Sequence, residues 1–235
     1  MTGRSAALVP AAGRGERLGP GTPKALRTLG GVPMYVHAVR ALAESREIDI
    51  VVVAAPEDGI ENVRSELAEQ PFATEVLVVT GGDTRQESVA RALIALPGDV
   101  DVVLVHDAAR PLVPVDLVDA VVASVRAGHP AVVPGLPVAD TIKSVDASAR
   151  VTGTPDRSTL RAIQTPQGFL RSVLQHAHAS VDLDDAPATD DAGLVEASGV
   201  EVTVIPGHEE AFKITRPLDL VLAEAVLARR RGSRA

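Results

Sequence analysis

The sequence contains no cysteine and no tryptophan, and aromatic residues make up only 2% of its 235 residues. Without cysteine the chain can form neither disulfides nor thiolate metal sites. The scarcity of aromatic residues leaves the core to Val, Leu, Ile and Ala. No apolar run approaches the ~20 residues that a membrane-spanning helix needs, and the N-terminus has no apolar run long enough for a signal peptide. We therefore expect a cytoplasmic protein that does not enter a membrane.

Positive charge is also in short supply, because 31 acidic residues outnumber 23 basic ones and leave a formal net charge of −8. An acidic chain of this kind is a poor candidate for a nucleic-acid binder held by phosphate contacts. The length suits one large α/β domain or two small ones, and it is sufficient for a buried core. No internal repeat and no linker divides the chain, so we expect a single domain over residues 1–235.

Short apolar runs alternate with longer segments of helical period in the first half of the chain. The runs predict strands, and the periodic segments predict helices. Runs that are apolar throughout are typical of parallel strands buried on both faces. The order therefore predicts an α/β fold, with a mostly parallel sheet and helices on both faces. The predicted strands are residues 6–11, 48–55, 75–82 and 100–111, the last ending in a polar loop, and the predicted helices are 33–45, 59–70, 84–96 and 115–128.

The pattern changes after Ala131. Short extended pieces, prolines and threonines fill residues 137–165, which predicts a hairpin-like arm that leaves the sheet. The other predicted elements are a helix over 170–180, an acidic loop that leads into a helix at Asp190, a pair of strands at 201–207 and 211–215, and a closing helix over 217–231.

A glycine-rich loop follows the first predicted strand, in the segment PAAGRGERLGPGTPK from Pro10 to Lys24. Its four glycines allow backbone N–H groups to approach an anion closely, and its cations Arg14, Arg17 and Lys24 add positive charge. In open α/β sheets ligands bind at the carboxyl ends of the strands, which is where this loop lies. Neither the Walker A pattern nor the dinucleotide fingerprint fits its spacing. The loop therefore predicts a polyphosphate site of another kind.

Three other segments add candidate residues at strand ends. TGGDTRQES, residues 80–88, could read a base, or could be a tight turn followed by an N-cap. Asp107 in VHDAARP could hold Mg²⁺, accept a hydrogen bond from a substrate or cap its own loop, and Arg110 beside it could bind a second phosphate. Lys213 in FKIT either points into a site or extends its amine to solvent. The residues alone leave these alternatives open.

Taken together, the segments resemble one family closely. PAAGRGERLGPGTPK, GGDTRQESV, VHDAARP, DTIK, TPQ, TDDA and FKITRPLDL occur in the order and spacing of the 2-C-methyl-D-erythritol 4-phosphate cytidylyltransferases, over nearly the whole chain. The resemblance implies a Rossmann-like fold of the nucleotide-diphospho-sugar transferase type. It implies a homodimer in which the arm over residues 137–165 embraces the partner. It also implies Mg²⁺-dependent transfer of CMP from CTP to 2-C-methyl-D-erythritol 4-phosphate, with release of pyrophosphate.

The resemblance implies residue roles position by position. Arg17, Lys24 and Lys213 are the expected catalytic residues, and Asp107 is the expected Mg²⁺ ligand. The expected CTP-binding residues are Pro10, Ala11, Ala12, Gly13, Gly15, Gly82, Asp83, Ser88, Asp107 and Ala108. The expected substrate-binding residues are Asp107, Arg110, Thr141, Arg157, Thr165, Thr189 and Lys213, of which Thr141 and Arg157 would reach the site of the partner subunit.

The implied reaction suits a chain with no evident nucleophile. The attacking group is a phosphate monoester oxygen, already ionised at neutral pH, so neither a nucleophilic side chain nor a general base is required. Cations must instead bring two polyanions together and stabilise the leaving pyrophosphate. His106 is therefore interpreted as structural, and His176 and His178, two apart on a predicted helix, make a poor metal pair.

Three other functions share part of this pattern. A cytidylyltransferase for another polyol phosphate, such as ribitol 5-phosphate, would use the same nucleotide half. A glycosyltransferase of similar topology is disfavoured, because the strand end carries one Asp rather than Asp-x-Asp. A non-catalytic nucleotide sensor would not require both Arg17 and Lys24.

Overall fold

The fold is built on one eight-stranded sheet, and the computed structural model describes residues 3–13, 27–180 and 189–232. The strands of this sheet are β1 (Arg4–Pro10), β4 (Ile50–Ala55), β5 (Glu75–Thr80), β6 (Val100–Val105), β7 (Ala131–Pro137), β10 (Arg161–Ile163), β11 (Gln167–Leu170) and β12 (Thr203–Pro206). They follow the order β10-β7-β11-β6-β1-β4-β5, with β12 also paired to β7. The β6-β1-β4-β5 part is parallel throughout, as predicted from its apolar runs.

The other side of the sheet is mixed. β11 lies between β6 and β7 and runs antiparallel to both, whereas β12 runs parallel to β7. The predicted pairing of residues 201–207 with 211–215 is wrong, because β7 takes β12 as its partner. In the second segment the Ile214 N–H donates to the Ala109 carbonyl at 2.9 Å. This segment is therefore attached to the loop after β6 and not to a sheet ladder.

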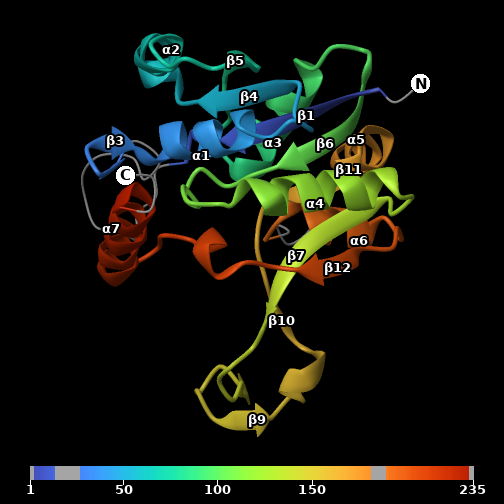
Figure 1. Ribbon diagram of the computed structural model, residues 1–235. Coiled ribbons are helices and arrows are strands. Elements are labelled where there is room, and N and C mark those ends of the chain that lie inside the picture. Colours follow the sequence, from blue (N-terminus) through green and yellow to red (C-terminus); the bar gives the residue numbers. More distant parts are fainter. Residues whose placement is uncertain (1–2, 14–26, 181–188, 233–235) are drawn as a thin grey trace.

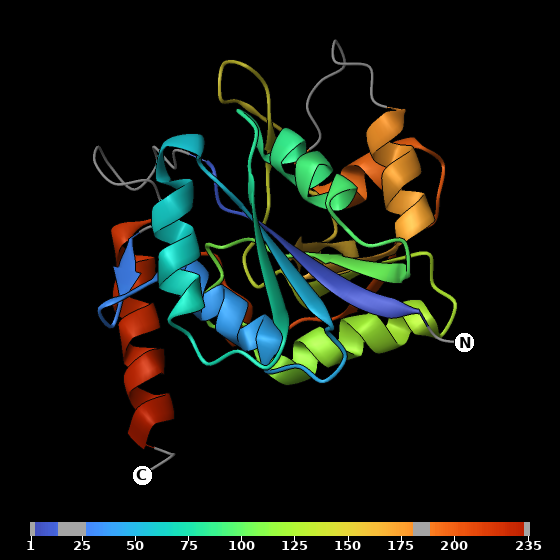
Figure 2. The same ribbon diagram turned by 90° about the horizontal axis from the view of Figure 1, so that it is seen from above.

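Helices cover both faces of the sheet, as predicted. One face carries α1 (Met34–Ala43), α2 (Ile60–Ala68) and α4 (Val115–Arg126), and the other carries α3 (Arg85–Ile94), α5 (Arg171–Ala179) and α6 (Asp191–Ala197). Figure 2 shows α1 and α4, in blue and lime, on the opposite side of the strands from α3 and α5, in green and orange. The sheet is the middle layer of three.

Strand alternation explains how one sheet packs against two helical layers. Val51 and Val53 of β4 pack with α1, α2 and α4, and their neighbours Ile50 and Val52 pack with α3, α5 and α6. Successive side chains of a strand point to opposite faces, so both sets must be apolar. All six residues of β4 are buried. With so few aromatic residues, the core is filled mainly by Val, Leu, Ile and Ala.

An arm leaves the sheet between β7 and β10. It contains the two-stranded sheet of β8 (Ser144–Val145) and β9 (Val151–Gly153) and a short 3-10 helix η4 (Arg157–Thr159). Figure 1 shows this segment, in yellow and gold, standing well away from the body of the molecule. Val145 is 56% exposed and Val151 is 60% exposed, so the arm leaves apolar surface uncovered in the single chain.

A third, smaller apolar cluster holds the closing helix α7 (Pro217–Gly232) against the body. Its buried members include Leu29, Met34 and Ile214, which places the segment of Lys213 beside α1 and β2 (Thr28–Leu29). β2 pairs with β3 (Val32–Pro33). Two further 3-10 turns are η3 (Glu57–Gly59) and η5 (Glu209–Ala211). Within the described ranges, none of the helices has the length and apolar character needed to cross a membrane.

Candidate active site

The candidate site lies where the parallel strands end. The Ala11 N–H donates to Ala54 O at 2.8 Å, Gly81 N–H to Ala55 O at 2.7 Å, and His106 N–H to Leu8 O at 2.8 Å. These bonds tie the loops that follow β1, β5 and β6 to the ends of β4 and β1. Pro10 to Gly13, the Gly82 turn and Asp107 therefore share one edge of the sheet, the usual place for a ligand in an open α/β fold.

The turn at Gly81 and Gly82 is packed against the first loop. A Cβ on Gly81 would lie 2.6 Å from the Ala12 Cβ, closer than two such atoms can approach. Ser88 is 1% exposed, and its Oγ accepts from the Gly82 N–H at 3.0 Å and donates to the Thr84 carbonyl at 2.9 Å. Thr84 caps α3 by accepting from the Glu87 N–H at 3.1 Å. Ser88 thus sets the shape of the turn from below, and Asp83 beside it is exposed.

Asp107 is a buried carboxylate shared by cations from three parts of the chain. Lys213 Nζ lies 2.7 Å from its Oδ2, Arg85 Nε lies 3.2 Å from its Oδ1, and Arg110 Nε lies 3.9 Å from its Oδ2. Burial alone would raise the pKa of Asp107, but the charges of Arg85, Lys213 and Arg110 outweigh it and hold that pKa well below its usual range. Asp107 is ionised at neutral pH.

Arg110 connects this carboxylate to the root of the arm. Its Nη1 donates to Ala211 O at 2.7 Å and its Nη2 to Ile163 O at 3.3 Å, while its buried Nε has no hydrogen-bond partner within the described part of the chain. Burial lowers the pKa of the Arg110 guanidinium. The side chain therefore fastens β10 and the segment before Lys213 to the Asp107 loop.

A chain of hydrogen bonds fixes the backbone at Asp107. The Asp107 N–H donates to Thr165 Oγ1 at 3.0 Å, and Thr165 Oγ1 lies 3.1 Å from His106 Nδ1. His106 Nε2 lies 3.1 Å from the Arg110 carbonyl, which can only accept, so Nε2 carries the proton and Nδ1 accepts from Thr165. Burial lowers the pKa of His106 to about 4. The histidine is neutral and structural at physiological pH, in agreement with its interpretation from the sequence.

A second buried carboxylate, Asp191, stands behind Arg85. Arg85 Nη1 donates to Asp191 Oδ2 at 2.6 Å, and His178 Nε2 lies 2.9 Å from Asp191 Oδ1. Burial would raise the pKa of Asp191, but the hydrogen bond from His178 and the charge of Arg85 lower it. Arg85 therefore bridges two ionised carboxylates, Asp107 and Asp191, that are far apart in sequence.

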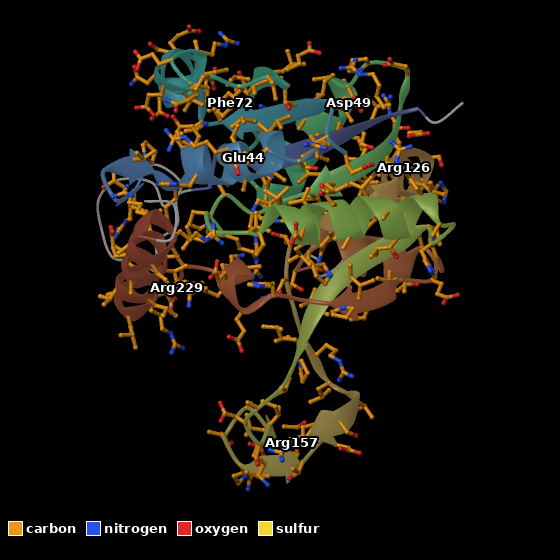
Figure 3. The ribbon with its side chains drawn as sticks, in the orientation of Figure 1. Glu44, Asp49, Phe72, Arg126, Arg157 and Arg229 are labelled. Atoms are coloured by element: carbon orange, nitrogen blue, oxygen red, sulfur yellow. The ribbon has the colours of Figure 1, made fainter. Side chains whose placement is uncertain are left out.

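Among the remaining predicted residues that the structure describes, three are exposed and one, Ala108, is buried. Thr189 is exposed, two residues before Asp191. Thr141 and Arg157 are exposed on the arm, where Arg157 Nη1 donates to Ala139 O at 2.9 Å (Figure 3). Ala108 is buried beside Asp107. The predicted residues Gly15, Arg17 and Lys24 lie outside the described residues.

Arg85, Asp191 and His178 were not among the residues predicted from the sequence. One signal was available for Arg85, because it is the first residue of α3. The N-terminus of a helix carries partial positive charge, so a cation there is unfavourable and needs a local reason. Asp191 lay within the TDDA motif, but its contact with residue 85 joins positions 106 apart in sequence. No local pattern announces that contact.

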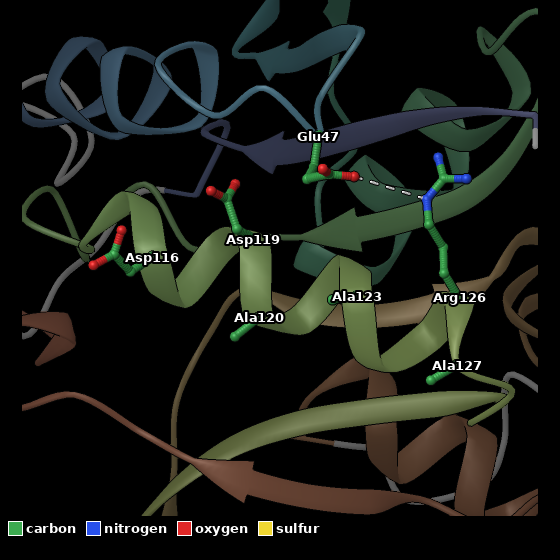
Figure 4. Close-up of a pocket in the computed structure, with 7 residues that line it drawn as sticks. All are labelled: Glu47, Asp116, Asp119, Ala120, Ala123, Arg126 and Ala127. Atoms are coloured by element: carbon green, nitrogen blue, oxygen red, sulfur yellow. Dashed lines mark ion pairs between the residues drawn. The ribbon is translucent and has the colours of Figure 1, made fainter.

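A surface hollow of about 700 Å³ lies along α4, and its lining lacks the group of cations found around Asp107. It is lined by Glu47, Asp116 and Asp119 and by small residues, with one ion pair between Glu47 and Arg126 at 4.0 Å (Figure 4). Three carboxylates against one guanidinium would repel a polyanion. None of its lining residues belongs to the predicted site.

The chain is similar to one family over nearly its full length. The family model described as 2-C-methyl-D-erythritol 4-phosphate cytidylyltransferase (IspD) matches residues 5–229. A curated protein of that name from Streptomyces coelicolor is 61% identical over 236 residues, which cover 97% of this chain and 86% of the relative. Its counterpart from Rhodococcus jostii is 53% identical over 94% of each chain.

Solved structures carry the same likeness. The structure of 2-C-methyl-D-erythritol 4-phosphate cytidylyltransferase from Thermus thermophilus has 38% sequence identity and a TM-score of 0.75, covering 96% of this chain and 98% of that one. The 4-diphosphocytidyl-2C-methyl-D-erythritol synthase from Anaerococcus prevotii has 26% identity and a TM-score of 0.84, covering 96% of both chains. The chain is an enzyme that belongs to the 2-C-methyl-D-erythritol 4-phosphate cytidylyltransferase family.

Proposed function

We propose that this enzyme transfers the cytidylyl group of CTP to 2-C-methyl-D-erythritol 4-phosphate. The observation that carries the proposal is the cluster of cations on Asp107, next to the Gly82 turn at the strand ends, in a chain of this family. Three cations, Arg85, Arg110 and Lys213, stand against the two carboxylates Asp107 and Asp191. The excess positive charge suits a site that must hold two phosphorylated substrates together.

The chemistry is an in-line displacement at phosphorus. An ionised oxygen of the polyol phosphate forms a bond to the α-phosphorus of CTP. The bond from that phosphorus to the α,β-bridging oxygen breaks, and pyrophosphate leaves with the electron pair. No proton has to be removed from the nucleophile. The protein supplies orientation and charge stabilisation. In this proposal Lys213 binds the incoming phosphate, and Arg17 and Lys24 of the glycine-rich loop stabilise the triphosphate.

The other residues take positions around these groups. We assign Pro10 to Gly13, Gly15, Gly82, Asp83, Ser88 and Ala108 to the nucleotide, with Asp107 at the junction of the two substrates. Thr165, Thr189 and Arg110 are assigned to the polyol phosphate side. Ser88 and Arg110 act through what they hold, because Ser88 shapes the Gly82 turn and Arg110 joins β10 to the Asp107 loop.

Mg²⁺ is the proposed cofactor, and the donor set limits how the protein can bind it. No cluster of three or more His, Cys, Asp or Glu side chains suited to a metal occurs in the ranges that the structure describes. Mg²⁺ commonly uses one or two carboxylates together with substrate phosphates and water. Asp107 fits that arrangement as a single protein ligand. When bound, the metal would neutralise charge on the phosphates.

The arm is proposed to complete the site of a second subunit. In the single chain, no hydrogen bond or ion pair within the described residues joins Thr141 or Arg157 to Asp107 or Lys213. The uncovered Val145 and Val151 suit burial against another protein surface. We therefore propose a homodimer through residues 137–165, working in the cytoplasm.

Pyrophosphate release tests the proposed reaction. The enzyme would be supplied with CTP, Mg²⁺ and 2-C-methyl-D-erythritol 4-phosphate, in parallel with ribitol 5-phosphate and with other nucleoside triphosphates. Release with CTP and the methylerythritol phosphate alone is expected. Release only with ribitol 5-phosphate would retain the mechanism and change the substrate. If CTP binds but neither polyol phosphate causes pyrophosphate release, the result would contradict the enzymatic assignment and favour a nucleotide sensor.

A further inference from the structure

Asp191 is a buried charge for which the reaction above has no use. Its side chain is 1% exposed, and it belongs to a helix that begins at the rim of the site. A buried carboxylate is costly unless it is paired and hydrogen-bonded. Both its oxygens are satisfied, Oδ2 by Arg85 and Oδ1 by His178. Such a pair needs a reason beyond stability, because buried ion pairs often add little to stability.

Arg85 is held so that part of its guanidinium remains available. Its Nε faces Asp107 at 3.2 Å and its Nη1 faces Asp191 at 2.6 Å. Among the described residues the Arg85 Nη2 has no hydrogen-bond partner. In that part of the chain, Arg110 Nε is the only fully buried side-chain nitrogen or oxygen without a partner. The Arg85 Nη2 is therefore accessible to solvent. The Arg85 side chain is 29% exposed, close to the 34% of Lys213. A guanidinium fixed on two sides and open on the third is pre-organised for an anion.

We propose that Arg85 binds the phosphate of the polyol substrate beside Lys213, and that Asp191 and His178 are positioning residues that hold it there. Arg85 and Lys213 bond to the two oxygens of the same carboxylate, which places the two cations close to each other. The assignment rests on the proposed function. It adds a second cation to the phosphate subsite and gives α5 and α6 a part in the reaction.

His178 supports Asp191 from the outer side. The Asp191 carboxylate can only accept, so His178 Nε2 carries the proton of this hydrogen bond. A glutamine at position 178 can keep a donor near that place, and a leucine cannot. The pair His178→Gln and His178→Leu therefore separates the hydrogen bond from the space that the side chain fills.

Steady-state kinetics with both substrates, together with titration calorimetry of the polyol phosphate, tests the proposal. Arg85→Gln and Asp191→Asn are expected to raise KM and Kd for the polyol phosphate by roughly 10- to 100-fold, the range of a lost charge-assisted hydrogen bond. KM for CTP should change less than about threefold. His178→Leu should show a smaller shift in the same direction, with recovery in His178→Gln. Asp119→Asn is the matched control, because it removes a carboxylate of α4 that accepts a hydrogen bond from Ser45. It should leave both KM values unchanged.

Two results would overturn the proposal. A rise in KM for CTP alone would assign Arg85 to the nucleotide. A fall in kcat and in melting temperature, with both KM values and the polyol phosphate Kd unchanged, would reduce the network to a structural ion pair. Absence of turnover in the wild-type enzyme would count against the proposed function, whereas the calorimetric comparison would still report on Arg85.

Discussion

At the scale of single residues, Asp107 decides how the site is organised. Its carboxylate accepts from Lys213 and Arg85, and its backbone N–H donates to Thr165. Charge-assisted hydrogen bonds of this kind offset the cost of burying the carboxylate. The buried Asp107 carboxylate thus fixes the positions of the Lys213 and Arg85 cations. In the proposed reaction, an incoming phosphate meets N–H donors whose positions are already set.

Removing the charge of Lys213 should therefore affect turnover more than folding. Lys213→Met keeps most of the apolar stem and removes the ammonium group. We expect kcat/KM for the polyol phosphate to fall by about 10²–10³-fold, the usual effect of losing one donor that stabilises developing charge. Initial-rate measurements of pyrophosphate release would check this.

Arg64→Ala is the control for loss of a cation at the surface. Arg64 lies on α2, away from the site, and donates hydrogen bonds to the Glu61 carboxylate and to the Val78 carbonyl of β5. It should leave kcat/KM within about twofold of wild type. An equal loss of activity in both variants would show that net charge, and not the position of Lys213, controls the rate.

At the scale of elements, close packing between loops shapes the proposed nucleotide side of the site. The turn after β5 approaches the loop after β1 so closely that only glycine fits at position 81, where a Cβ would lie 2.6 Å from the Ala12 Cβ. Both carbons are attached to backbone, so neither can rotate away. The spacing of the two loops therefore depends on this glycine.

Gly81→Ala should push the two loops apart. We expect KM for CTP to rise by about tenfold and the free energy of unfolding to fall by about 1–3 kcal/mol, as for overpacking of a close contact. Gly98→Ala is the matched control, because nothing lies within 4 Å of its added Cβ. Kinetics and urea denaturation of both variants would test this. Equal KM values for CTP in the two variants would contradict it.

The contact of α1 with the β2 segment carries a pH dependence. His37 is buried on α1, with its Nε2 2.8 Å from Leu29 O, and Arg40, Arg231 and Glu224 are the charges that face it. Burial, aided by the two arginines, lowers the pKa of His37. As pH falls through about 6.5, the unfolded chain takes up a proton at this position before the folded one does, so the folded state loses stability.

His37→Gln should remove that contribution, because glutamine does not titrate. The free energy of unfolding of wild type should decrease more between pH 7.5 and pH 5.5 than that of the variant. Urea denaturation at the two pH values would measure both differences. Parallel changes in the two proteins would show that His37 does not titrate differently on folding.

At the scale of the whole molecule, the arm predicts that each site needs two subunits. If Arg157 serves the partner's site, a subunit with Arg157→Ala and a subunit with Lys213→Met can form one intact site between them. The first then supplies Lys213 and the second supplies Arg157. In a symmetric dimer the other site carries both defects.

Co-expression of the two variants should therefore recover activity that neither has alone. Random pairing makes about half of the dimers mixed, each with one intact site, so about a quarter of wild-type activity is expected. Mixing the purified variants under conditions that prevent subunit exchange is the control. No recovery in co-expressed protein would contradict the proposed reach of the arm into the partner's site.

Much of this molecule follows from its sequence because the relevant signals are local. Continuous apolar runs predicted β1, β4, β5 and β6, helical period predicted the helices that connect them, and Asp190 was placed correctly at the start of α6. The motifs at strand ends also brought Asp107 and Lys213 forward as candidates. In each case the pattern lies within about a dozen residues, a window long enough to show the spacing of apolar residues in a strand or helix.

Only the tertiary structure decided which distant segments meet. The alternation in residues 211–215 resembles a strand, but β7 binds β12 and β11 enters the sheet between β6 and β7. The bridge from Asp107 through Arg85 to Asp191 likewise depends on three chain segments meeting at one edge of the sheet. Pairing of this kind is a competition among all available edges and charges, and its outcome depends on the packing of the whole chain rather than on any single stretch of it.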